Sequence, residues 1–251
     1  MEPQYTPPQP HMSKGARMGL GVIVTIIGLI ALIFGGFFVY YAWQFKYGDA
    51  TALEQISNSI NDDNFTLANG SQSQQAKATV PINTLVRDHN PTQGSASAPV
   101  TVMAFIDFEC PYCQESYATF KTIMNKYRGG VRFVFKHMPL TAIHPNAVAA
   151  AHASQCAHDQ NKFWDYYNVL FTNKQFTSSA LIDAASLVSL NVEEFTACLD
   201  AQTFALEIQE DVLDGLDLGV RGTPTYYINQ TILEGVADES TWDSLILNEL
   251  Q

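Results

Sequence analysis

The sequence predicts an α/β domain in which a strand-helix-strand unit and a strand-strand-helix unit flank an all-helical insertion. One transmembrane helix is predicted to precede this domain. Three observations support the prediction: an uncharged apolar run over residues 18–45, a strand pattern that leads directly into two closely spaced cysteines, and a pair of short strands near the C-terminus.

The run over 18–45 is longer than the roughly 20 apolar residues that a membrane-spanning helix needs. It ends on bulky aromatic residues, whereas a cleaved signal peptide ends on small ones. Lys14 and Arg17 precede the run, and Asp49 and Glu54 follow it. The excess of positive charge on the N-terminal side places the N-terminus in the cytoplasm. We therefore expect a single-pass protein of the cell membrane whose folded domain is extracytoplasmic.

Composition divides the rest of the chain. Residues 1–17 are rich in proline and are predicted to form a short cytoplasmic tail. Residues 46–84 are mostly polar and are predicted to be a linker. The folded domain is then 85–251, with its helical insertion at about 143–219.

The net charge of -12 argues against a nucleic-acid partner, because phosphate contacts need clustered Lys and Arg. From Val192 to the C-terminus there are 13 acidic residues and a single basic one, Arg221. We interpret this run as solvated helical faces.

The first half of the domain is predicted from two strands and one helix. Residues 99–108 form a continuous β-branched and aromatic run, which is typical of a strand buried on both faces. Residues 131–137 alternate as a second strand. Between these strands, apolar residues recur at helical spacing at Tyr117, Phe120, Met124 and Tyr127.

The insertion is predicted to consist of several helices, the first rich in alanine and the next rich in aromatic residues. In its last helix an apolar face is formed by Phe204, Ile208, Val212 and Leu216. We expect the acidic residues of that helix to point outward: Glu207, Glu210, Asp211 and Asp214. A hairpin over 224–234 and a helix over 238–250 complete the domain.

Cys110 and Cys113 lie where the first strand gives way to a helix. Free main-chain N–H groups and the helix dipole stabilise a thiolate there, which selects Cys110 as the nucleophile. The spacing brings Cys113 within one turn, so it can attack a mixed disulfide formed at Cys110. Pro111 suits the first turn of a helix. A zinc site is the competing interpretation, but it needs further ligands, and the only nearby histidines, His137 and His144, are more typical of surface or capping positions.

Cys156 and Cys198 fall in different helical pieces of the insertion. A disulfide between them would clip the insertion together and would contribute about 4 kcal/mol in the chain-entropy model. Two free buried cysteines remain the alternative.

The motifs resemble the DsbA-type thiol:disulfide oxidoreductases from about residue 90 to the C-terminus. The motifs that carry the resemblance are Phe105-Ile-Asp-Phe-Glu-Cys-Pro-Tyr-Cys113, His144-Pro-Asn-Ala, Lys162-Phe-Trp164 and Gly222-Thr-Pro-Thr-Tyr226. The resemblance implies a thioredoxin fold, with Cys110 as an exposed attacking cysteine and Cys113 as a buried resolving one. It also implies that Pro224 is a cis-proline and that Thr223 faces the active-site sulfur and binds substrate.

The resemblance implies a protein-disulfide oxidoreductase that introduces disulfides into cysteine-containing secreted proteins. It further implies a membrane reoxidant of the DsbB or vitamin K epoxide reductase-like type, and no cofactor beyond the redox-active disulfide. Tyr112 replaces the histidine of the best-known members, and Pro-Tyr also occurs in reductive glutaredoxins. A reductase or isomerase therefore stays open, as do a non-catalytic binding module and a kappa-type glutathione transferase.

Overall fold

The computed structural model describes residues 28, 30, 34–37 and 80–251. The predicted tail (1–17), most of the predicted anchor (18–45) and most of the predicted linker (46–84) lie outside these residues. Among the residues that are described, no helix has the length and apolar character needed to cross a membrane.

The chain divides into two units, Met1–Ser59 and Ile60–Gln251. In the first unit, the described residues 28, 30 and 34–37 are helical. The second unit contains the folded domain.

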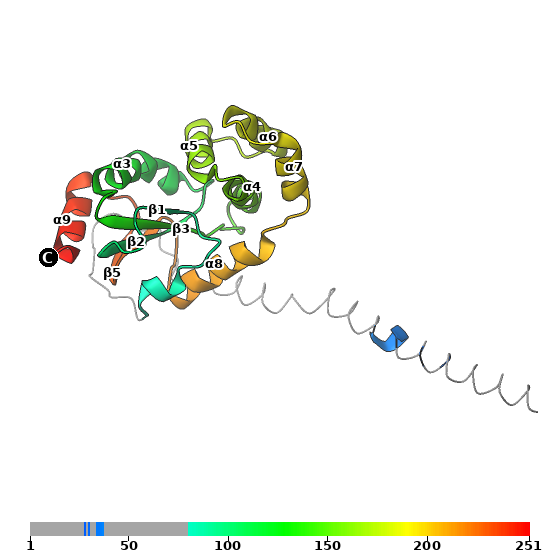
Figure 1. Cartoon of the computed structure of the whole chain (residues 1–251), viewed down its shortest axis with the longest axis horizontal. Coiled ribbons are helices and arrows are strands. Elements are labelled where there is room, and N and C mark those ends of the chain that lie inside the picture. The colour runs from blue at the N-terminus through cyan, green and yellow to red at the C-terminus, as the bar shows by residue number, and fades with distance from the viewer. Residues whose placement is uncertain (1–27, 29, 31–33, 38–79) are drawn as a thin grey trace, which may run out of the picture. The chain divides into compact units, whose positions relative to one another are not determined.

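Within the described residues, five strands form one mixed sheet in the order β1-β3-β2-β4-β5 (Figure 1). The strands are β1 (Thr92–Gln93), β2 (Val100–Ile106), β3 (Val131–His137), β4 (Thr225–Ile228) and β5 (Thr231–Glu234). β2 and β3 are parallel and every other pair is antiparallel. The two predicted strands and the C-terminal hairpin are confirmed. β1 was not predicted, since two residues are too short to show alternation.

The central strand β2 is buried on both faces, as its continuous apolar pattern predicts. Val102 and Ala104 contribute to the core on one face of the sheet. Met103 and Phe105 contribute to the core on the other face. Because both faces are covered, β2 is a rigid support for the turn that follows it.

Helices cover each face of this sheet (Figure 1). On one face lie α3 (Pro111–Tyr127) and α9 (Glu239–Glu249). On the other face lie η1 (Ile82–Leu85) and α8 (Ala205–Asp217). Gly215 permits the close approach of α8, because a Cβ at this position would lie 3.1 Å from Phe105 Cδ1.

The remaining helices form the insertion between β3 and α8 (Figure 1). They are α4 (Ala147–Asp159), α5 (Phe163–Asn173), α6 (Ser178–Leu187) and α7 (Val192–Asp200). A disulfide between Cys156 and Cys198 joins α4 to α7. The predicted structural disulfide is therefore confirmed.

The orientation of α8 differs from the sequence prediction. Asp211 and Asp214, which we expected to point outward, are buried. The helix is rotated so that these carboxylates meet the ammonium group of Lys136, whose side chain is fully buried in β3. A buried cation must be paired, and this requirement outweighs the preference of the carboxylates for water.

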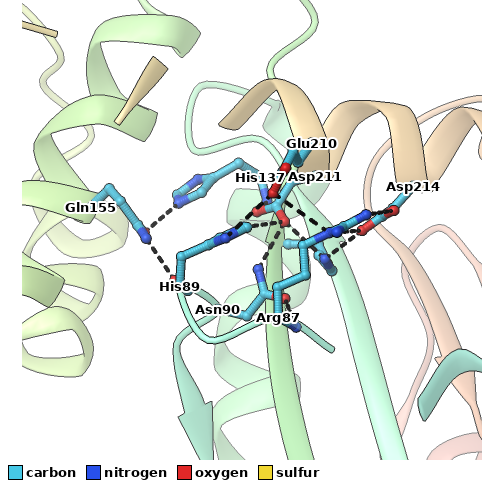
Figure 2. A network of polar contacts seen from close by, with 9 residues as sticks. Arg87, His89, Asn90, His137, Gln155, Glu210, Asp211 and Asp214 are labelled. Carbon is cyan, nitrogen blue, oxygen red and sulfur yellow. Dashed lines mark hydrogen bonds and ion pairs between the residues drawn. The ribbon is translucent and has the colours of Figure 1, made fainter. Parts of the chain in front are cut away.

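The two aspartates organise a polar network between α8, β3 and the segment before β1 (Figure 2). Asp214 binds the Arg87 guanidinium through both carboxylate oxygens. Asp211 accepts hydrogen bonds from the Asn90 amide at 2.8 Å and from the His137 main-chain N–H at 2.9 Å. The network fixes the segment that leads into the domain against the sheet.

Candidate functional site

The two cysteines occupy the turn between β2 and the first turn of α3. Cys110 is the N-cap residue of α3, Pro111 begins the helix, and Cys113 lies within its first turn. The Thr223–Pro224 peptide bond, immediately before β4, is cis. Cys110 Sγ lies 3.3 Å from the Thr223 carbonyl oxygen, to which its thiol donates a hydrogen bond. The structure therefore brings together the site residues that the sequence predicted.

The pKa of the Cys110 thiol is lowered from its ordinary value to about 6. The hydrogen bond from the Cys113 thiol is the main cause, and it outweighs the opposing effect of burial. Thr223 and the main-chain amides of Tyr112 and Cys113 lower the pKa further. These amides are among the free N–H groups at the start of α3, so the predicted stabilisation by the helix N-terminus is present.

Cys113 has the opposite character. Complete burial, the hydrogen bond to Cys110 and the charge of Cys110 raise the pKa of its thiol well above the ordinary value. Near neutral pH one sulfur is a thiolate and the other a thiol. This asymmetry makes Cys110 the attacking sulfur and Cys113 the one that retains a proton.

The exposed attacking cysteine implied by the family resemblance is not what the structure shows. Cys110 is 3% exposed and Cys113 is 1% exposed, so neither residue has a substantial exposed surface. The reason is that the Cys110 thiol packs against the Thr223 carbonyl. Tyr112, at 38% exposed, is the accessible side chain of the motif.

Thr223 contributes a second group besides its carbonyl. Its hydroxyl oxygen is buried and makes no hydrogen bond to any other described residue. Its proximity lowers the pKa of both cysteine thiols. The hydroxyl is thus placed to donate to whichever sulfur carries negative charge.

Two carboxylates beside the cysteines were not predicted as site residues from the sequence. Asp107 accepts a hydrogen bond from His144 Nδ1 at 2.7 Å, and Glu109 accepts one from the Asn146 main-chain N–H at 2.6 Å. Asp107 could have been found from the sequence, because an acidic residue inside a buried apolar strand needs partners. Its partners Leu140 and His144 could not have been found, since they lie more than thirty residues away.

The histidines considered as zinc ligands have other roles. His144 binds Asp107, and His137, expected at the surface or in a cap, is buried and contacts Gln155 Oε1 at 3.2 Å. In the described part of the chain, no group of three or more His, Cys, Asp or Glu residues is arranged to hold a metal ion.

The fold and this site together define a thioredoxin-like domain that carries a pair of free thiols. Residues 87–248 match the family model described as "Thioredoxin". This match covers more than half of the chain, which therefore belongs to that family.

Among curated proteins, the chain is similar to "Na(+)/H(+) antiporter NhaA 1" of Salinispora arenicola, with 37% identity over 145 residues. The match covers 57% of this chain but only 22% of that protein. The similarity therefore concerns about a fifth of the antiporter's length.

Solved structures show the same domain. BdbD from Bacillus subtilis, in its oxidised form, has 26% identity and a TM-score of 0.62, and the match covers 70% of this chain and 98% of that one. The thiol-disulfide exchange protein alpha-DsbA2 from Wolbachia pipientis has 21% identity and a TM-score of 0.61, with 68% and 92% covered. The second likeness shows the fold alone.

Proposed function

We propose that this protein is a membrane-anchored, extracytoplasmic thiol:disulfide oxidoreductase, acting as a dithiol oxidase on secreted proteins. The observation that carries the proposal is the pair of unequal sulfurs, with the pKa of Cys110 lowered to about 6 and that of Cys113 raised. The match of residues 87–248 to the thioredoxin family model supports it.

In the proposed cycle a substrate thiolate attacks Cys110 Sγ in the oxidised enzyme. The Cys110–Cys113 bond breaks, and its electron pair passes to Cys113 Sγ, which takes up a proton. A second substrate thiolate then attacks the substrate sulfur of the mixed disulfide and releases the Cys110 thiolate. The substrate loses two electrons and the cysteine pair gains them.

The lowered pKa favours the oxidising direction. A stabilised Cys110 thiolate stabilises the reduced enzyme, which makes its disulfide a stronger oxidant. The value of about 6 lies between those of thioredoxin, about 7, and DsbA, about 3.5.

The proposed surroundings follow from the sequence. Residues 18–45 would anchor the protein in the cell membrane, with the N-terminus in the cytoplasm. The substrates would be cysteine-containing secreted proteins. A quinone-linked membrane protein of the DsbB or vitamin K epoxide reductase-like type would accept the electrons, and no cofactor beyond the redox-active disulfide is required.

The reduction potential of the Cys110–Cys113 couple tests the direction of electron flow. Equilibration of the full chain with glutathione buffers should give a value clearly above the about -270 mV of thioredoxin, in the direction of the about -120 mV of DsbA. A value at the thioredoxin end would instead indicate a reductase.

A Cys113→Ser variant tests the class of activity. In this variant the Cys110 thiolate of an oxidoreductase should attack a disulfide of a partner protein, release one partner thiolate and stay in a mixed disulfide, because the Cys113 sulfur that would displace the partner is absent. A binding module would trap nothing, and a Cys110→Ser variant is the matched control.

A further inference from the structure

Two carboxylates flank Phe108 in the turn between β2 and α3, and both bind the loop 138–146. This loop leads from β3 into α4 and thus into the helical insertion. Asp107 contacts the first part of the loop and Glu109 contacts its end. The redox-active turn is therefore held by the insertion through two separate side chains.

The Asp107 carboxylate is fully buried and has a donor on each oxygen. Oδ1 accepts from the Glu109 main-chain N–H at 2.8 Å. Oδ2 accepts from the Leu140 main-chain N–H at 2.9 Å and from His144 Nδ1 at 2.7 Å. Each carboxylate oxygen thus faces a main-chain N–H group, which can only donate a hydrogen bond. The side-chain NH₂ of an asparagine can also only donate, so in either orientation it would face one of these N–H groups without forming a hydrogen bond.

Glu109 forms the second attachment. Its Oε2 accepts from the Asn146 main-chain N–H at 2.6 Å, and its Oε1 accepts from Asn146 Nδ2 at 2.9 Å. Asn146 precedes α4, but its side chain makes no capping hydrogen bond to that helix. The Asn146 side chain therefore binds Glu109, the residue that immediately precedes Cys110.

We propose that Asp107 and Glu109 are positioning residues that hold Cys110 in its reactive geometry by clamping the 138–146 loop onto the active-site turn. Neither carboxylate reacts. Their effect is to keep Cys110 at the N-terminus of α3 and in contact with the Thr223 carbonyl.

Removing the Asp107 carboxylate has two opposite expected effects on the pKa of Cys110, one through its charge and one through its contacts with the loop. A nearby negative charge disfavours a thiolate, so loss of the charge alone would lower the pKa of Cys110. The stabilising contacts of the Cys110 thiolate come from Cys113, Thr223 and the first amides of α3. If the clamp maintains those contacts, its loss raises the pKa instead.

The test is a titration of the Cys110 thiolate in the reduced full chain, followed by its ultraviolet absorbance. In Asp107→Asn the pKa should rise by about one, which is tenfold in the ratio of thiolate to thiol. A lower or unchanged pKa in a folded variant would overturn the proposal.

A second variant provides the same test without any change of charge. Asn146→Ala removes the contact of Asn146 Nδ2 with Glu109 Oε1, keeps the main-chain N–H contact with Oε2, and leaves the Cys-Pro-Tyr-Cys motif and both acids in place. It should also raise the pKa of Cys110, by less than Asp107→Asn does. An unchanged pKa in Asn146→Ala would remove the Asn146 side-chain contact from the proposal, and this variant carries the test of the clamp if Asp107→Asn does not fold.

The matched control is Asp211→Asn, which replaces another buried aspartate that accepts main-chain and side-chain hydrogen bonds. It should reduce stability without changing the pKa of Cys110. A rise in that pKa equal to the rise in Asp107→Asn would show that any loss of stability raises it.

The inference rests on the proposed function only in taking Cys110 as the attacking sulfur. If Cys110 of the unmodified chain forms no thiolate near pH 6, the proposed function is contradicted. If it does, but the pKa of Cys110 is the same in the variants, only the proposed clamp is contradicted.

Discussion

Cys110 and Cys113 are chemically identical residues three positions apart, yet their surroundings move their pKa values in opposite directions. Cys110 lies at the N-terminus of α3, where free main-chain amides and the Thr223 side chain stabilise its thiolate. Cys113 lies inside the helix among buried residues, and it donates to Cys110. The different reactivity of the two sulfurs therefore depends on a difference in position of less than one helical turn.

Alkylation of the reduced protein should report this asymmetry. The rate of modification should follow a single titration with a midpoint near pH 6, because the thiolate of Cys110 is the reacting form. Mass spectrometry after partial modification should place the label on Cys110. A Cys110→Ser variant should lose the reaction below about pH 9, and rapid labelling of Cys113 in that variant would contradict the assignment.

Part of the site could be predicted from residues alone. The spacing and context of Cys110 and Cys113 indicate redox chemistry, since each step needs a second sulfur within one turn. Thr223 and Pro224 were recognised only through the family resemblance, because a Thr-Pro pair is an ordinary turn signal. Asp107 was missed because local patterns do not reveal which distant loop a buried carboxylate binds.

At the scale of single elements, α8 shows what an apolar pattern leaves undetermined. The spacing correctly predicted a helix, with Ile208 buried. The pattern did not reveal that Lys136, in β3, would need Asp211 and Asp214 as partners inside the protein. Burial acts to raise the pKa of Asp211, but the His89 hydrogen bond and the Lys136 charge outweigh it and lower the pKa.

Lys136→Met should therefore be strongly destabilising. Methionine is of similar length but leaves two buried carboxylates without their shared cation. Removing one partner of a buried pair costs about 3–5 kcal/mol. Urea denaturation measures the loss. Lys126→Met, which removes an exposed pair with Asp243, is the control and should change the midpoint little. Equal effects in both variants would contradict the structural role of Lys136.

The insertion depends on a different device, the disulfide between α4 and α7. The 42-residue separation of Cys156 and Cys198 gives an entropic contribution of about 4 kcal/mol. A Cys156→Ala, Cys198→Ala double variant should lose stability of this order in thermal denaturation. The pKa of Cys110 should stay near 6, because neither cysteine contributes to it. A large change in that pKa would show that the disulfide also shapes the active site.

At the scale of the whole domain, the sheet separates two cores that were predicted with different success. The core beside α3 and α9 is almost entirely apolar and aromatic, so hydrophobic patterns predict its elements well. The side covered by α8 combines apolar residues with the network around Asp211, which joins segments distant in sequence (Figure 2). Residues 80–84 were assigned to the linker, although Ile82 lies in the core on this side, because so short a segment has no periodic signature.

The buried His137 predicts how the free energy of unfolding varies with pH in the oxidised protein. Burial lowers the pKa of His137 to about 4, so below its ordinary value the unfolded chain binds a proton that the native protein does not. The free energy of unfolding should therefore fall by about 3 kcal/mol as the pH drops from about 6.5 to about 4. His137→Phe, which suits the surrounding rings of Phe108, Phe135 and Phe163, should flatten this slope.

The reduced protein should show an additional change at higher pH. Cys110 is a thiolate in the native protein above about pH 6, whereas in the unfolded chain its thiol keeps its proton up to about pH 9. Between these values the unfolded chain binds more protons, so the stability of the reduced form should increase with pH. The oxidised form has no thiol at this position and should stay level. Urea titrations of both forms from pH 6 to 9 would measure the divergence, and parallel curves would contradict a stabilised Cys110 thiolate.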